Sequence, residues 1–223
     1  MKVQIVSDIH LKFISNSLKP FKVAAPNLIL AGDITNRYDP ELLNKYFSLL
    51  SPLYRKIYYV PGNHEYFSRT YDHQHITKEL EKICRNHNNI EFLYNRTLMS
   101  NSIAIFGAPF PTKHLKQEHE LSKTALQKFL NLPQRRCLII THYAPLLTDV
   151  FHPKWTHQPS LPRFCFDGLS LIPPGLNKEI TWIFGHTHYA CDFVRNNVRF
   201  ISNPVRNENR LLPFDETKTI NID

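Results

Sequence analysis

The sequence predicts an α/β fold, in which short buried strands alternate with amphipathic helices along the chain. Seven short apolar runs predict the strands, and three stretches with an apolar residue every three to four positions predict the helices. The chain has 223 residues, of which 42% are hydrophobic and 21% are charged. Such values are typical of globular proteins and exclude a disordered or fibrous chain. We therefore expect residues 1–223 to form a single domain.

The expected strands are short, and most of them end at a turn signal or a polar residue. Runs that are apolar throughout are typical of strands that are buried on both faces, as in parallel sheets. The runs are Lys2–Ser7, Leu28–Ala31, Lys56–Val60, Ser102–Phe106, Cys137–Thr141, Ile180–Phe184 and Val198–Ser202.

The expected helices lie between these strands, over Glu41–Leu50, Asp72–Asn86 and Lys113–Asn131. Each spaces its apolar residues so that they fall on one helical face, which we expect to pack on a sheet. In the second helix this face holds Leu80, Ile83 and Cys84, and in the third it holds Leu121, Ala125, Leu126 and Phe129.

A proline-rich stretch, Phe151–Pro174, has no clear period and is too long for a simple connection. Long irregular loops are often lids or binding loops, so we expect residues 151–174 to form an active-site loop. Within it, Trp155 is expected either to anchor the loop by packing or to stack on an aromatic part of a substrate. His152 and His157 are expected at the loop surface, with a substrate contact as the alternative.

The cysteines and the N-terminus indicate the compartment. Cys84, Cys137, Cys165 and Cys191 stand singly, with no C-x-x-C pair, which predicts reduced thiols and a reducing compartment. The N-terminus lacks the apolar region and cleavage site of a secretory signal. No apolar run approaches the roughly 18 residues of a membrane span. We therefore expect a cytoplasmic protein without a membrane partner.

The charge of the chain favours an anionic partner. Lys and Arg number 27 against 19 Asp and Glu, which gives a formal net charge of +8. Such a charge suits partners from phosphorylated small molecules to nucleic acid. No basic stripe interleaved with aromatic residues is visible, so nucleic acid is compatible with the charge but not specifically indicated. The oligomeric state, monomer or homodimer, is left open.

Metal-ligating residues follow five of the expected strands. Ligands of α/β proteins bind at the carboxyl ends of strands, so these residues are expected to converge. The five segments are Asp8-Ile9-His10, Gly32-Asp33, Gly62-Asn63-His64-Glu65, His142 and Gly185-His186-Thr187-His188. Three of the six glycines of the chain stand beside an expected ligand, where a side chain would crowd the site or forbid the turn.

The spacing and chemistry of these residues indicate a metal site. Residues two apart on an extended segment point the same way, so Asp8 with His10, and His186 with His188, can each supply two ligands to one side. The mixed oxygen and nitrogen donors suit Mn most, with Fe, Zn or Ni as alternatives. The absence of cysteine from all five segments argues against a structural zinc site. Asp33 is the natural bridging ligand, because a carboxylate has two oxygens.

The five segments, in this order from residue 8 to residue 188, resemble the calcineurin-like metallophosphoesterase superfamily. The resemblance implies a four-layer α/β-β/α sandwich, with two mixed sheets flanked by helices and a dinuclear metal site at the strand ends. It implies one metal held by Asp8, His10, Asp33 and His188, and another held by Asp33, Asn63, His142 and His186.

The resemblance also implies a mechanism for the hydrolysis of a phosphomonoester or phosphodiester. Two divalent cations roughly 3.5–4 Å apart bind a bridging hydroxide, which attacks phosphorus in line. Asp33 bridges the cations, and His64, which is not a ligand, is the candidate general acid for the leaving alkoxide. Asn63 and His64 are also expected to contact the substrate.

Two further stretches bear on the branch of the superfamily. Gly32–Arg37 resembles the G-D-x-x-x-R stretch of serine/threonine protein phosphatases, which makes Arg37 a candidate phosphate contact. That branch has an aspartate where this chain has Asn36, so the resemblance implies no His64–carboxylate pair. Thr141-His142-Tyr143-Ala144-Pro145 and Phe200–Pro204 are similar to stretches of small bacterial and phage-type phosphoesterases.

Other interpretations remain beside this one. Within enzymes, the alternative is a metal-dependent nuclease or nucleotide phosphodiesterase, which the charge would suit. From another class, the alternative is a non-catalytic scaffold or binding protein with the same fold, which would be expected to lose ligands that this chain keeps. His73 and His75 form another H-x-H pair, but we expect them to be solvated or to cap a helix.

Overall fold

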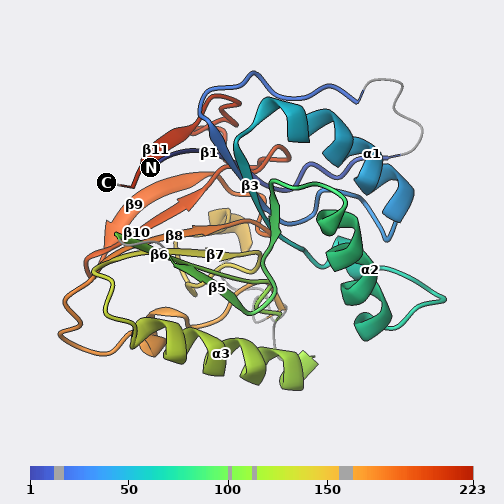
Figure 1. Cartoon of the computed structure of the whole chain (residues 1–223). Helices are drawn as coiled ribbons and strands as arrows, with labels where there is room; N and C mark the ends of the chain where they lie inside the picture. Colours follow the sequence, from blue (N-terminus) through green and yellow to red (C-terminus); the bar gives the residue numbers. More distant parts are fainter. Residues whose placement is uncertain (13–17, 100–101, 112–114, 156–162, 223) are drawn as a thin grey trace.

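The computed structural model describes residues 1–12, 18–99, 102–111, 115–155 and 163–222. Two β-sheets pack face to face, and helices cover the outer face of each sheet (Figure 1). The two chain ends lie side by side at β1 and β11, where the Met1 amine donates a hydrogen bond to the Ile222 carbonyl over 2.8 Å.

The first sheet has five strands and is mixed. β1, β2, β3 and β4 are mutually parallel, and β11 pairs antiparallel with β1. Their order across the sheet is β11 (Thr219–Asn221), β1 (Lys2–Val6), β2 (Asn27–Ala31), β3 (Lys56–Val60) and β4 (Ile90–Phe92).

The second sheet has six strands and is also mixed. Its four inner strands are parallel, and both edge strands run antiparallel to their neighbours. Their order is β5 (Arg96–Met99), β6 (Ile103–Ala108), β7 (Arg136–Thr141), β8 (Glu179–Phe184), β10 (Val198–Ser202) and β9 (Cys191–Arg195).

The inner strands of both sheets are largely apolar because they are buried on both faces. In β2, Ile29 and Ala31 point to the core between the sheets, whereas Leu28 and Leu30 point to the core beneath the outer helices. This alternation follows from the period of two along a strand. The same division recurs in β7 and β8, so one continuous apolar run supplies two separate cores.

Three helices form the outer layers. α1 (Pro40–Leu50) and α2 (His73–Arg85) cover the first sheet, and α3 (Lys116–Leu130) covers the second. Asp39 and Asp72 cap α1 and α2, because each carboxylate accepts a hydrogen bond from a backbone N–H in the first turn. Short 3₁₀ helices lie at η1 (Ser51–Leu53), η2 (His64–Tyr66), η4 (Pro153–Trp155) and η6 (Leu169–Leu171).

The predicted four-layer α/β architecture is confirmed, and all seven predicted strands are present with small shifts at their ends. The structure adds β4, β5, β9 and β11, which are the edge strands of the two sheets. None of the described helices is long and apolar enough to span a bilayer. The predicted faces of α2 and α3 are buried, or half-buried at Ala125, with one exception: Leu121 is 54% exposed, so its assignment to the packed face was wrong.

Two leucines of α3 allow a matched test of this packing. Leu126→Ala removes a fully buried side chain from the core of the second sheet, and we expect the free energy of unfolding to fall by about 2–5 kcal/mol. Leu121→Ala, on the same helix but exposed, is expected to change it by about 0.5 kcal/mol or less. Urea denaturation of both variants measures the difference, and equal losses would show that the α3 face is assigned incorrectly.

Candidate metal centre

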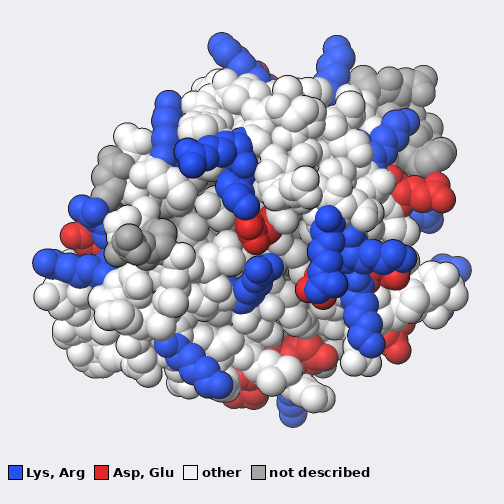
Figure 2. All heavy atoms as spheres, viewed as in Figure 1, with Lys and Arg blue, Asp and Glu red and all other residues white. Residues whose placement is uncertain are grey.

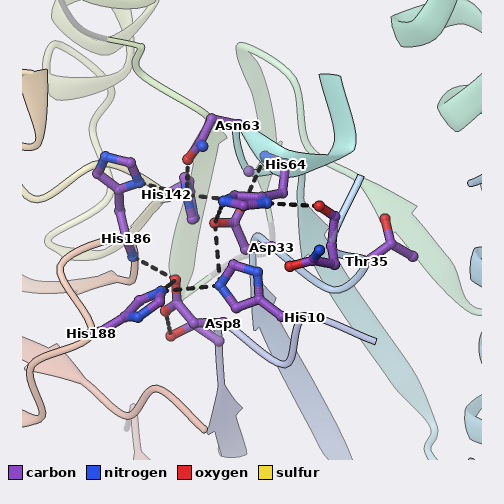
Figure 3. Close-up of polar contacts among 12 residues, drawn as sticks. Asp8, His10, Asp33, Thr35, Asn63, His64, His142, His186 and His188 are labelled. Atoms are coloured by element: carbon purple, nitrogen blue, oxygen red, sulfur yellow. Dashed lines mark hydrogen bonds and ion pairs between the residues drawn. The ribbon is translucent and has the colours of Figure 1, made fainter. Parts of the chain in front are cut away.

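The five predicted ligand segments meet at one place, where the carboxyl ends of strands from both sheets adjoin. β1, β2 and β3 of the first sheet lead to Asp8, Asp33 and Asn63, and β7 and β8 of the second sheet lead to His142, His186 and His188. Figure 3 shows these side chains pointing toward one another. The Asp8 carboxylate joins the sheets directly, since it accepts a hydrogen bond from the His186 N–H over 2.9 Å.

The first group of candidate ligands contains Asp8, His10, Asp33 and His188, one donor atom from each lying within 4.8 Å of the others. The His10 and His188 Nε2 atoms are 3.0 Å apart. Asp33 Oδ2 lies 3.7 Å from His10 Nε2, and Asp8 Oδ1 lies 3.5 Å from His188 Nε2. Two nitrogens and two carboxylates that converge in this way offer lone pairs to one cation.

The second group contains Asp33, His142 and His186. Asp33 Oδ1 and His186 Nδ1 lie 3.4 Å and 3.1 Å from His142 Nε2. The Asn63 side-chain oxygen lies 3.0 Å from the same nitrogen, so the amide predicted as a ligand is also in place. Because Asp33 turns one oxygen toward each group, the geometry agrees with its predicted bridging role.

A hydrogen bond behind the site selects the ligating atom of His142. His142 Nδ1 lies 2.9 Å from the Ala31 carbonyl oxygen, which can only accept. Nδ1 therefore carries a proton and donates it, which leaves the Nε2 lone pair of the neutral ring for the site. Support of this kind behind a ligand is typical of metal-binding histidines.

The protonation of the groups favours cation binding at three of the histidines and competes with it at Asp8 and His142. Burial lowers the pKa of His10 to about 3 and raises the pKa of Asp8 to about 7. Burial also lowers the pKa values of His186 and His188, so three of the imidazoles are neutral near pH 7. Burial alone would lower the pKa of His142, but the Asp33 charge raises it to about 9. A bound cation would displace that proton, because ligands bind metal deprotonated.

The backbone at the site is strained. Asp8, His10, Asp33, His186 and His188 all have φ between 51° and 72°, in the left-handed region that residues with a side chain rarely adopt. Such strain costs roughly 1–2 kcal/mol per residue and persists where surrounding structure enforces it. These turns allow residues that directly follow the strands to aim their side chains at one point.

The glycines at the site are required by close approach. A Cβ on Gly32, Gly62 or Gly185 would lie 2.2, 2.1 or 2.6 Å from a side-chain atom of His142, Asp33 or Asp8, respectively. Real Cβ atoms do not approach other atoms so closely. A side chain at any of these three glycines would therefore crowd the site, as expected from the sequence.

Glu65 organises the loops but had no predicted role. Its buried carboxylate accepts hydrogen bonds from the backbone N–H groups of Gly62, Asp33 and Thr35, over 2.6, 3.0 and 2.9 Å. It thereby ties the loop after β3 to the loop after β2. The position of Glu65 in the Gly62–Glu65 segment indicated that it lies near the site. The sequence alone does not distinguish a carboxylate that binds metal from one that accepts hydrogen bonds from backbone N–H groups.

His64 lies beside the two groups of ligands. Its Nδ1 lies 2.9 Å from the Asn36 carbonyl oxygen and its Nε2 lies 3.9 Å from Asp33 Oδ2. A carbonyl oxygen can only accept, so Nδ1 donates to it and Nε2 is left on the side of Asp33. The orienting partner is thus a backbone carbonyl at Asn36 and not a side-chain carboxylate.

A cavity of about 420 Å³ opens over the ligands, and Asn63 and His64 line it. Arg37 is exposed and is not among the described residues that line this cavity. From the predicted loop, Phe151, Trp155 and Phe164 line it. Phe67 and Glu208 also line it, and no periodicity or spacing in the sequence marked either of them.

The other singled-out histidines lie apart from the ligand groups in the described part of the chain. His73 stacks on Tyr66 with ring centres 4.0 Å apart, and His75 stacks on Tyr71 at 4.5 Å. His152 Nδ1 accepts a hydrogen bond from the Lys154 N–H over 3.2 Å. His157 lies outside the described residues.

Comparison with known proteins identifies the family. The sequence profile of the calcineurin-like phosphoesterases matches residues 1–190. This chain belongs to the calcineurin-like phosphoesterase family. The family is one of metal-dependent phosphoester hydrolases, and the two ligand groups described above are residues that could hold the metal.

Individual relatives support this fold over nearly the whole chain. A protein of Acanthamoeba polyphaga mimivirus, uncharacterized protein L509, is 28% identical over 275 aligned positions that cover 99% of this chain and 96% of the relative. Phosphopantetheinyl hydrolase from Mycobacterium tuberculosis has a TM-score of 0.69 at 16% identity, covering 92% of this chain and 89% of that protein.

A third relative has a different role. GAP50, described as the anchor in the inner membrane complex of Plasmodium, has a TM-score of 0.57 at 11% identity, covering 91% of this chain and 70% of that protein. At such low identities these structures show a shared fold alone.

Metal stoichiometry tests the shared carboxylate. We expect the Mn²⁺-loaded protein to retain near two metal ions per chain by elemental analysis, and Asp33→Asn to lower the occupancy of both sites because each loses a carboxylate oxygen. Asp39→Asn is the matched control, since it changes the α1 cap to another good capping residue away from the site. An Asp33→Asn variant that still binds two ions would reject the bridging role.

Proposed function

We propose that this chain hydrolyses a phosphomonoester or phosphodiester by in-line attack of hydroxide on phosphorus. The observation that carries the proposal is the pair of ligand groups that share Asp33 at the base of a cavity. Two bound divalent cations would supply hydroxide by lowering the pKa of water and would neutralise charge on the phosphoryl oxygens. We propose Mn²⁺ as the native metal on the basis of the oxygen and nitrogen donors.

The chain itself would provide substrate contacts and proton transfer. Asn63 and His64 line the cavity beside Asp33, where a phosphate group would lie. In the proposed reaction the phosphorus–oxygen ester bond breaks, and His64 Nε2 donates its proton to the leaving alkoxide. The carbonyl of Asn36 holds the ring so that Nε2 stays directed toward the cavity side. Arg37 stays a prediction, supported by its sequence position and not by the cavity lining.

The charge on the face shown in Figure 2 gives no specific support for a nucleic-acid substrate. On the face shown in Figure 2, Lys and Arg are spread among Asp and Glu, and their densest group lies over α2. On that helix Lys82 and Arg85 pair with Glu79 and Glu81, so their charge is largely compensated. A nuclease needs a continuous basic path for the phosphate backbone.

The intact site favours an enzyme over a scaffold. The candidate ligands converge in the two groups, with Asn63 beside the second, and the general-acid candidate lines the cavity. This arrangement supports the proposal of an enzyme. The four cysteines are buried and none of them forms a disulfide, which supports the proposal of a reducing compartment such as the cytoplasm.

Metal-dependent turnover tests the proposed function. We expect the Mn²⁺-loaded protein to hydrolyse p-nitrophenyl phosphate or bis(p-nitrophenyl) phosphate, to lose this activity in EDTA and to regain it when Mn²⁺ is restored. The comparison of the two substrates decides between monoester and diester preference. No hydrolysis of either by protein with both metals bound would contradict the proposal and favour the scaffold.

Leaving-group dependence tests His64. We expect His64→Ala to lower kcat/KM by roughly 10²–10⁴-fold for a phosphate ester with a poor leaving group. The loss should be much smaller with p-nitrophenolate, which leaves without protonation, and metal content should stay unchanged. Asn36→Ala is the control, because it keeps the carbonyl that orients His64. If His64→Ala lowered kcat/KM equally for both substrates, the general-acid role would be excluded.

A further inference from the structure

Aromatic side chains line the cavity beside the candidate ligands. The cavity has a volume of about 420 Å³, which falls within the roughly 300–1,000 Å³ of small-molecule sites. Its lining includes Asp33, His186 and His188. It also includes four aromatic residues, Phe67 from the loop after β3 and Phe151, Trp155 and Phe164 from the predicted loop 151–174.

Three of these rings are exposed to solvent. Phe67 is 53% exposed, and Trp155 and Phe164 are each 41% exposed. Leaving large apolar surface in water forgoes the stabilisation of about 25 cal/mol per Å² that burial would bring. Exposed aromatic rings that gather around one cavity, instead of being scattered, mark a binding surface.

The indole of Trp155 is held in position from two sides. Its Nε1–H donates a hydrogen bond to Glu208 Oε2 over 3.0 Å. Lys154 Nζ lies over the ring, 4.7 Å from its centre, and forms an ion pair with the same oxygen at 3.0 Å. The backbone N–H of Glu208 donates to the His188 carbonyl over 2.6 Å, which connects this support to the ligand loop. A ring oriented before binding loses little freedom when a ligand stacks on it.

Two further rings lie directly against residues of the proposed reaction. Phe67 packs on His64 with ring centres 4.4 Å apart, and Phe164 lies 5.4 Å from His186 at an interplanar angle of 31°. His64 is the proposed proton donor to the leaving alcohol. The part of the substrate that departs as the alcohol would therefore lie among the aromatic rings, and the phosphate would lie against the ligands.

We propose that the alcohol half of the substrate carries a planar ring that stacks in this aromatic cavity, as the base of a nucleoside monophosphate would. Every purine or pyrimidine offers a π face to rings such as Trp155, Phe164 and Phe67. A sugar phosphate without a base leaves these rings uncovered. The inference rests on the proposed function, since it specifies the substrate class of the same site.

A pair of substrates that differ in the ring tests the proposal. Adenosine 5′-monophosphate and ribose 5-phosphate present the same primary phosphomonoester, and only the first carries a base. We expect kcat/KM of the Mn²⁺-loaded protein to be roughly 5- to 150-fold higher for the nucleotide, which corresponds to the stacking of one base. Trp155→Ala should reduce this ratio, Trp155→Phe should retain most of it, and Tyr71→Ala, at an exposed aromatic residue outside the cavity, should leave it unchanged.

Tryptophan fluorescence provides a readout that does not depend on turnover. The chain has two tryptophans, and Trp182 is fully buried, so a ligand stacked in the cavity acts on Trp155. We expect adenosine 5′-monophosphate, but not ribose 5-phosphate, to quench the emission of the wild-type protein. Trp155→Phe should abolish the quenching.

The kcat/KM ratio and the fluorescence quenching together distinguish failure of the aromatic-ring proposal from failure of the proposed function. Equal kcat/KM for the two substrates, without quenching, would overturn the aromatic-ring proposal and leave the phosphoesterase function intact. Quenching by the nucleotide in a metal-loaded protein that hydrolyses no phosphoester would overturn the proposed function and retain the ring-binding site. Quenching that survives in Trp155→Phe would show that the base binds elsewhere, and it would also overturn the proposal.

Discussion

One buried carboxylate, that of Asp33, connects the parts of the site. Its two oxygens face two different groups of imidazoles, and its Oδ1 accepts a hydrogen bond from the backbone N–H of His64 over 2.8 Å. Its own N–H is held by Glu65, so the loops after β2 and β3 are organised around a single side chain. The absence of a Cβ on Gly62 allows the loop after β3 to approach Asp33 closely.

The sequence predicts the strands that hold the site because these strands are buried on both faces, which leaves a continuous apolar run at positions such as Leu28–Ala31. Edge strands such as β4 and β9 are short or partly exposed, so they leave no such run. Leu121 shows a related limit, since helical spacing places it at the margin of the α3 face, where the depth of the core decides its burial.

The ligands were predictable because each directly follows a strand that could be recognised, in an order that is typical of the family. Glu65 and the aromatic cavity were not predictable in the same way. Glu65 binds backbone N–H groups, which leave no trace in the spacing of residues. Trp155 and Phe164 belong to the predicted loop 151–174, and Trp155 was expected either to anchor that loop or to stack on a substrate, but Phe67 comes from a distant segment and joins them only through tertiary folding. The sequence thus indicates the ligands and the loop, whereas the contacts that assemble the cavity form over long range.

Anomalous X-ray diffraction from crystals of the Mn²⁺-loaded protein tests the two-metal site most directly. The account predicts two anomalous peaks roughly 3.5–4 Å apart, one on each side of the Asp33 carboxylate. One peak is expected among Asp8, His10 and His188, and the other among Asn63, His142 and His186. A single peak at full Mn²⁺ loading, or two peaks of which one lies away from Asp33, would contradict the shared-carboxylate centre on which the proposed hydrolysis depends.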